Sequence, residues 1–172
     1  MSDRIGNWMQ TIGGRAFYPL DPHPSDIDIM DIGCALSMLC RFGGHCNRFY
    51  SVAEHSFRVS KAIEEAGGTK DEMFAGLMHD AAEAYVGDMV WPVKQAMPEY
   101  KRIEKLVEQA IAMKFDLPDP MPPIGCPPPR TPPRMSPRPP VPAHPLATSN
   151  AAPIANCLVF MCVAPAERVL PQ

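Results

Sequence analysis

The chain has 172 residues, of which 46% are hydrophobic and 20% charged, and its formal net charge is −3. This composition suits one globular domain and excludes the basic surface typical of nucleic-acid-binding proteins. No apolar run approaches the roughly 20 residues that cross a membrane, and the N-terminus lacks a secretory pattern, so we expect a cytoplasmic protein. The six cysteines show no C-x-x-C pair, which indicates free thiols in a reducing compartment.

The composition changes sharply near residues 119–123. Seventeen of the 22 prolines lie from Pro118 onward, and the last lysine is Lys114. Residues 1–119 carry 12 Lys and Arg against 18 Asp and Glu, whereas the remainder carries four Arg and one Glu. Prolines remove backbone donors and fix φ, so they prevent regular helices. We therefore predict a helical domain over 1–123 and a Pro/Arg-rich tail over 124–172 that does not fold independently.

The first predicted elements are an irregular arm and one helix. Gly13-Gly14 and three prolines mark residues 1–25 as irregular, and we expect Trp8, Phe17, Tyr18 and Leu20 to pin this arm onto the body. The acidic stretch Ser25–Asp31 predicts the start of an amphipathic helix. Gly43-Gly44 is predicted to end this helix.

Capping boxes predict the next two helices. Ser51–Glu54 has the capping-box spacing and opens a helix with His55 on its apolar side. Thr69–Glu72 has the same spacing and opens a helix that runs to Gly87, followed by a short connector. Pro98 opens a long last helix. The sequence therefore predicts an all-α bundle of about five helices.

The His-Asp pair is the centre of the functional hypothesis. His79 and Asp80 are adjacent within an apolar helical pattern, and Glu83 shares a helix face with His79. Burying ionisable groups costs free energy unless they are paired or bind a metal. His55 alone on an apolar stripe is more often a hydrogen-bonded core residue, but the His-Asp pair favours a divalent cation held by His55, His79 and Asp80.

The loop Arg41–Phe49 holds Arg41, His45 and Arg48 within nine residues. One interpretation is a solvated basic loop with an exposed histidine. The other is a clamp for phosphate or another oxyanion, because guanidinium offers forked hydrogen-bond donors.

Two runs, RFGGHCNRFYSVAEHSFRVS and GLMHDAAEAYVGDMVWPVK, carry a family resemblance. They resemble the HD-domain metal-dependent phosphohydrolases, in particular small bacterial and phage members such as 5′-deoxynucleotidases and deoxynucleoside triphosphohydrolases. The resemblance covers about residues 5–123. It implies a helical bundle that holds one divalent metal ion through a pattern His…His-Asp…Asp.

The resemblance also implies roles for individual residues. The first three metal ligands match His55, His79 and Asp80, and the residues that assist catalysis match Glu83 and Asp88. Arg41 looks like the family's phosphate-binding arginine. Independently of the resemblance, His45 in the same loop is either a further substrate donor or, as we favour, an exposed loop histidine. Two alternatives stay open: Glu83 as the partner that fixes a histidine tautomer, and Asp88 as a cap of the following turn.

The sequence departs from the family at the last metal ligand, because no aspartate follows Asp119. We favour a frameshift near Ile124 over a divergent protein or a sequencing artefact. The missing ligand implies a partly open metal site and impaired activity.

The leading hypothesis is a nucleotide phosphohydrolase that uses a metal-activated water. The ligand types do not distinguish Mn²⁺, Co²⁺, Zn²⁺, Fe²⁺ and Mg²⁺. The alternatives are a catalytically dead member that binds metal or nucleotide, and an adaptor that acts through its Pro-rich tail. The expected partner is a small nucleotide, with no nucleic acid or membrane, in a possible homo-oligomer.

Overall fold

The computed structural model describes residues 4–119. The predicted tail over 124–172, and the last residues of the domain predicted over 1–123, lie outside this range. The described chain is mostly helical, which confirms the all-α prediction. Its elements are β1 (Met9–Gln10), β2 (Ala16–Phe17), η1 (Pro24–Asp26), α1 (Ile29–Met38), η2 (Arg41–Gly44), α2 (Val52–Glu65), α3 (Lys70–Met78), α4 (Glu83–Val86), α5 (Trp91–Gln95) and α6 (Pro98–Phe115).

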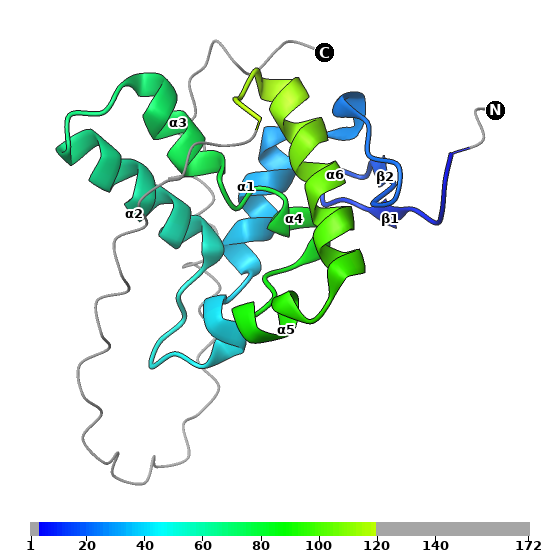
Figure 1. Cartoon of the computed structure of the whole chain (residues 1–172), viewed down its shortest axis with the longest axis horizontal. Coiled ribbons are helices and arrows are strands. Elements are labelled where there is room, and N and C mark those ends of the chain that lie inside the picture. Colours follow the sequence, from blue (N-terminus) through cyan, green and yellow to red (C-terminus); the bar gives the residue numbers. More distant parts are fainter. Residues whose placement is uncertain (1–3, 120–172) are drawn as a thin grey trace, which may run out of the picture.

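The helices enclose one hydrophobic core. Figure 1 shows α2 and α3 as a helical hairpin on one side, α1 and α6 through the middle, and α5 beneath α6. The short α4 lies between α1 and α6 and packs against both. Fully buried apolar side chains fill the interior, among them Phe17, Ile27, Ile32, Leu36, Val52, Leu77 and Val107. Within the described residues, no helix combines the length and apolar character needed to cross a bilayer.

Side-chain caps start three of the helices. The Asp28 carboxylate accepts the Met30 amide at 2.7 Å and begins α1. Thr69 and Glu72 form the predicted capping box at α3. At α2, the Ser51 hydroxyl accepts the Glu54 amide at 3.0 Å, but the Glu54 carboxylate pairs with the arginines at 48 and 58. The second half of that capping box was therefore wrong, because two cations nearby are stronger partners for a carboxylate than one amide.

The N-terminal arm is more regular than predicted, since β1 and β2 form a small antiparallel hairpin. Phe17 is the anchor of this arm: it is fully buried and stacks on Tyr85 with ring centroids 3.9 Å apart. Trp8 and Leu20 stay 55% and 39% exposed, so their predicted anchoring role was wrong. Of the four predicted anchors only Phe17 lies in a strand, and there it points to the core while its neighbour Ala16 is exposed.

The predicted helix boundaries differ from the structure at two further places. The first helix ends at Met38 rather than at Gly43-Gly44, because the chain turns extended and Cys40 forms a β-bridge with Ser51. The predicted connector after Gly87 contains the helix α5, which Pro92 helps to begin.

The helix predicted to run from Thr69 to Gly87 is interrupted at residues 79–82. There the backbone hydrogen bonds join residues three apart, as in a 3₁₀-helix. Ala81 N donates to Met78 O at 2.9 Å, and Glu83 N donates to Asp80 O at 3.0 Å. The Gly76 carbonyl, which the Asp80 amide would meet in a continuing α-helix, accepts a hydrogen bond from the His79 ring at 2.8 Å. This side-chain bond competes with the α-helical pattern, which hydrophobic periodicity does not reveal.

The α2–α3 hairpin packs closely at Gly76. A β-carbon there would overlap the δ-methyl group of Ile63 and lie 3.5 Å from a Val59 methyl and 3.6 Å from the Ser60 α-carbon. Glycine therefore lets the two helices approach one another, and this approach sets the separation of the side chains at their facing ends.

We predict that Gly76→Leu lowers the free energy of unfolding by about 1–3 kcal/mol, because the larger side chain has no space between α2 and α3. Gly76→Ala is the matched control: the half-buried Ile63 methyl can rotate away, and alanine raises helix propensity by about 1 kcal/mol. Urea unfolding of both variants checks this. Equal stabilities would contradict the packing argument.

Candidate metal centre

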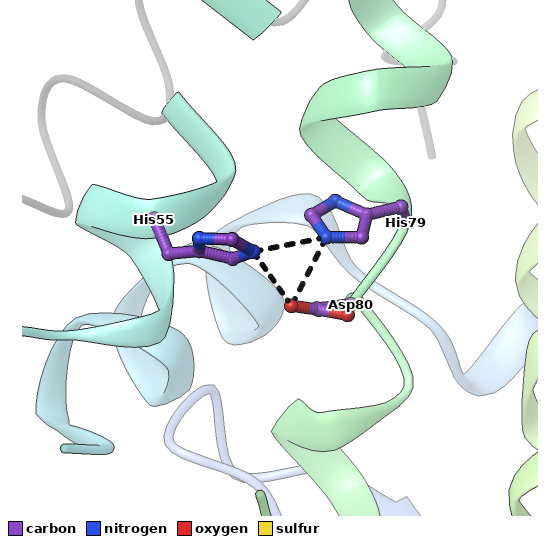
Figure 2. A group of neighbouring side chains, drawn as sticks. All are labelled: His55, His79 and Asp80. Atoms are coloured by element: carbon purple, nitrogen blue, oxygen red, sulfur yellow. Dashed lines mark hydrogen bonds and ion pairs between the residues drawn. The ribbon is translucent and has the colours of Figure 1, made fainter. Parts of the chain in front are cut away.

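Three side chains from the facing ends of α2 and α3 converge in one cluster. His55 lies in the first turn of α2, His79 caps the C-terminus of α3, and Asp80 follows it. The two histidine Nε2 atoms are 3.2 Å apart, and Asp80 Oδ2 lies 3.4 Å from His55 Nε2 and 3.1 Å from His79 Nε2. Figure 2 shows the two rings facing each other with the carboxylate beside them. The structure therefore brings together the three residues predicted as metal ligands.

The hydrogen bond at His79 defines which ring nitrogen is available. A carbonyl oxygen can only accept, so the 2.8 Å contact between His79 Nδ1 and Gly76 O requires a proton on Nδ1. In the neutral ring, Nε2 then carries a lone pair that points at the other members of the cluster. Backbone carbonyls hold metal-binding histidines in this way in many proteins.

The cluster fits a cation. The lone pair of neutral His79 and the Asp80 carboxylate are both acceptors, so their 3.1 Å contact is unfavourable unless a proton or a metal ion lies between them. Bonds of about 2.1 Å from one metal ion would also place neighbouring ligand atoms roughly 3.0–3.4 Å apart. The observed separations of 3.1 to 3.4 Å lie within that range. Among residues 4–119 this is the one His/Cys/Asp/Glu group of suitable geometry.

The charge states suit metal binding as well. Burial, followed by the positive charge of Arg41, lowers the pKa of His55 to about 4, so its ring is neutral at pH 7. Burial by itself would raise the pKa of Asp80. When the His79 ring is protonated, its hydrogen bond and its charge, together with the charge of Arg41, outweigh burial and bring this pKa to about 2, so Asp80 is ionised; a metal ion would take the place of that proton. A neutral imidazole and an ionised carboxylate are the forms that bind metal ions.

Arg41 is the first residue of η2, and its side chain lies next to the cluster. Its Nη1 donates to Asp80 Oδ2 at 2.8 Å, and both side chains are mostly buried. Its Nε is buried without a hydrogen-bond partner among the described residues. The sequence indicated a role in phosphate binding for Arg41, and the contact with Asp80 is an addition from the structure.

Glu83 and Asp88 lie outside the three-residue cluster. Glu83 is 8% exposed. Glu83 Oε2 and Asp88 Oδ2 are both buried without a hydrogen-bond partner in the described part of the chain. Burial, together with the charges of Asp80 and Asp88, raises the pKa of Glu83 to about 9. Glu83 is therefore protonated at neutral pH, in contrast to Asp80, so this stretch holds two carboxyl groups of opposite protonation state.

His45 is an exposed residue at the end of η2 and is not part of the cluster. Arg48 is also exposed, and it pairs with Glu54 at 2.9 Å. These two positions fit the solvated-loop interpretation of residues 41–49, whereas Arg41 points toward the cluster.

Residues of α5 and α6 that were not predicted support Glu83 and Asp88. Lys94 forms an ion pair with the buried Glu104 at 2.5 Å, and its charge lowers the pKa of Glu83. The Tyr100 hydroxyl donates to the carbonyl of Gly87 at 2.7 Å and ties α6 to the turn before Asp88. The run V-W-P-V-K after Asp88 contains Lys94, but nothing in its spacing indicates that this lysine pairs with a residue of α6.

The chain is similar to two groups of known proteins, uncharacterized ones over most of its length and nucleotidases over a shorter stretch. No family model matches the chain. It is 39% identical over 112 residues to the uncharacterized protein YfdR of Escherichia coli K12, covering 65% of this chain and 60% of that protein. An uncharacterized protein of Rhodobacter capsulatus is 37% identical over 120 residues, covering 67% and 61%. The chain thus spans about 60% of the length of these relatives.

A shorter similarity points to an enzyme. The 5′-deoxynucleotidase YfbR of Escherichia coli O1:K1 is 33% identical over 79 residues, which cover 37% of this chain and 40% of that protein. A 5′-deoxynucleotidase of Citrobacter koseri matches to the same extent. This distant similarity supports the resemblance to nucleotidases over a minority of the chain.

We predict that Glu83→Gln makes the metal-free protein less sensitive to alkaline pH. The folded-state pKa of about 9 lies above the ordinary value of 4.5, so Glu83 destabilises the folded state progressively as pH rises from 4.5 through 9. The stability advantage of the variant should be small at pH 5 and grow by up to about 1.4 kcal/mol per pH unit. Urea unfolding in a chelator at pH 5, 7 and 8.5 measures it.

Glu65→Gln, at an exposed position of α2, is the matched control and should show no such trend. A difference between Glu83→Gln and the unchanged protein that stays constant with pH would show that Glu83 is ionised in the folded state.

Proposed function

We propose that this chain is a metal-dependent phosphohydrolase of the HD-domain type that acts on nucleotides. The observation that carries the proposal is the convergence of His55, His79 and Asp80 within 3.4 Å, with Arg41 on the same carboxylate. The partial similarity to 5′-deoxynucleotidases supports a nucleotide as the substrate class.

His55, His79 and Asp80 would hold one divalent metal ion. Two imidazoles and one carboxylate suit Mn²⁺, Co²⁺, Zn²⁺ or Fe²⁺, and Mg²⁺ is not excluded by the donor set. Such an ion supplies an activated water at neutral pH and stabilises charge on a phosphoryl oxygen. The protein's own contribution is to fix both rings, through the first turn of α2 for His55 and the Gly76 carbonyl for His79.

Arg41 would bind the phosphoryl group. Its buried Nε lacks an acceptor among residues 4–119, and a phosphate oxygen would provide one. Charge that builds up on the phosphoryl oxygens during the reaction would then meet a fixed guanidinium. The contact between Arg41 and Asp80 holds the guanidinium at the edge of the proposed metal site.

Glu83 and Asp88 would handle protons. The raised pKa of Glu83 keeps its carboxyl protonated at neutral pH, which supports a role in which it orients the attacking water through a hydrogen bond or gives up a proton during the reaction. Asp88 would protonate the leaving oxygen or fix a sugar hydroxyl. His45, on the exposed end of η2, would contact substrate only outside the metal cluster.

A second candidate is a binding protein without catalytic activity. The described residues supply three candidate ligands, one fewer than the four of the family pattern, and residues 120–172 contain no aspartate. Calorimetry that shows metal and nucleotide binding without product would favour this candidate. The adaptor hypothesis concerns the tail, which lies outside the described residues.

We predict that the purified chain hydrolyses a panel of deoxynucleotides only after a divalent metal ion such as Mn²⁺ or Co²⁺ is added, and that His79→Ala lowers kcat/KM at least about 100-fold. Loss of the residues that merely orient metal ligands already costs 10- to 100-fold. Released phosphate and the remaining nucleotide are measured together, which identifies the bond that is cleaved.

The matched control is His23→Ala, because His23 is an exposed histidine at the start of η1. It should leave turnover and metal dependence unchanged. Absence of turnover with every metal ion and every nucleotide of the panel would reject the enzymatic proposal.

We also predict that Arg41→Ala lowers kcat/KM by about 10²–10³, as expected for the loss of a donor to the charge of the transition state. Metal binding should persist, since Arg41 is not a ligand, and calorimetric metal titration tests this. Arg58→Ala removes an exposed arginine of α2 and serves as the control. Equal kinetics of the two variants would remove Arg41 from the site.

A further inference from the structure

Two cysteines flank the turn that carries Arg41. Cys40 directly precedes η2 and Cys46 follows it, and their sulfur atoms are 3.3 Å apart. Both side chains are partly exposed, and both are reduced. This separation is shorter than an ordinary contact of two unbonded sulfur atoms, so the chain already holds the two thiols next to each other.

Backbone contacts create this proximity. Cys40 is fixed on one side by its β-bridge to Ser51, and the Arg41 amide donates to the Tyr50 carbonyl at 2.9 Å. On the other side, the Cys46 amide donates to Gly44 O at 2.8 Å and closes a tight turn. The two cysteines therefore meet because the loop returns on itself, independently of any side-chain packing from other helices.

The turn has backbone freedom where a disulfide would need it. An S–S bond is about 2.0 Å long, so the sulfurs must approach by roughly 1.3 Å. Gly43 and Gly44 lie between the cysteines with φ of 60° and 83°, a region that glycine adopts without steric cost. Phe42, next to Gly43, has a φ of 59°, which is uncommon outside glycine.

We propose that Cys40 and Cys46 form a reversible dithiol–disulfide pair that closes a ring around the Arg41-bearing turn. The oxidant is a small disulfide such as oxidised glutathione. One protein thiolate attacks it, forms a mixed disulfide and releases one small thiol; the second thiolate then attacks the protein sulfur and releases the other. Two electrons pass from the protein thiols to the small disulfide, and the two thiol protons end on the small thiols.

The pair is coupled to the metal centre by position. Arg41 lies inside the proposed ring and contacts Asp80 at 2.8 Å. Ring closure would therefore stiffen the segment that holds the guanidinium. Formation of the disulfide does not depend on the phosphohydrolase proposal, and the experiment below measures it without any activity assay.

The test uses the full chain equilibrated with mixtures of reduced and oxidised glutathione. Remaining thiols are alkylated in acid-quenched samples, and tryptic peptides are identified by mass spectrometry. Cleavage after Arg15, Arg41 and Arg48 places Cys46 in peptide 42–48 and Cys40 in peptide 16–41, together with Cys34. We expect these two peptides to be linked in oxidising mixtures and separate again after dithiothreitol.

Two variants assign the link. It should persist in Cys34→Ser, which removes the other thiol of peptide 16–41, and it should be lost in Cys40→Ser. Three results would overturn the proposal: loss of the link in Cys34→Ser, a stable mixed disulfide with glutathione at Cys46, or full alkylation of both thiols in every mixture.

Discussion

The hydrogen bond from the His79 ring to the Gly76 carbonyl is the interaction on which the rest of the site depends. At 2.8 Å, it fixes the tautomer of His79 and leaves Nε2 facing His55 and Asp80. It also occupies the carbonyl that would continue the α-helix, so α3 ends at the ligand. The tighter turn that follows presents Asp80 beside His79. One side-chain contact thus sets the chemistry and the backbone shape together.

The polar groups around this bond are costly for the fold. Arg41, Glu83 and Asp88 each bury a polar atom without a partner among the described residues. Such atoms cost free energy in a folded protein unless something else binds them. Their position beside a three-ligand cluster gives a physical reason for their presence, because a metal ion and a phosphate group would satisfy acceptors and donors of these kinds. The core around Ile32, Leu36 and Val107 offsets that cost.

Much of this arrangement was predictable from the sequence. Capping residues such as Thr69 and apolar periodicity identified the long helices, and the spacing of His55 from the His-Asp pair identified the three side chains that the structure brings together. The break after Met78 was not predictable, since it arises from a side-chain bond that competes with the helix. The pairing of Arg41 with Asp80 and the support from Lys94 and Tyr100 depend on tertiary contacts, for which the sequence carries no periodic signal.

The α2–α3 hairpin has a consequence for the order of folding. The two histidines are 24 residues apart in the chain, and Asp80 follows directly, so the three candidate ligands belong to one local unit. Closing a loop of this length takes well under a millisecond, whereas docking of α6 requires contacts with residues far away in the sequence. We therefore expect the ligands to meet early, so that a metal ion present during synthesis would encounter its site before the rest of the bundle has closed.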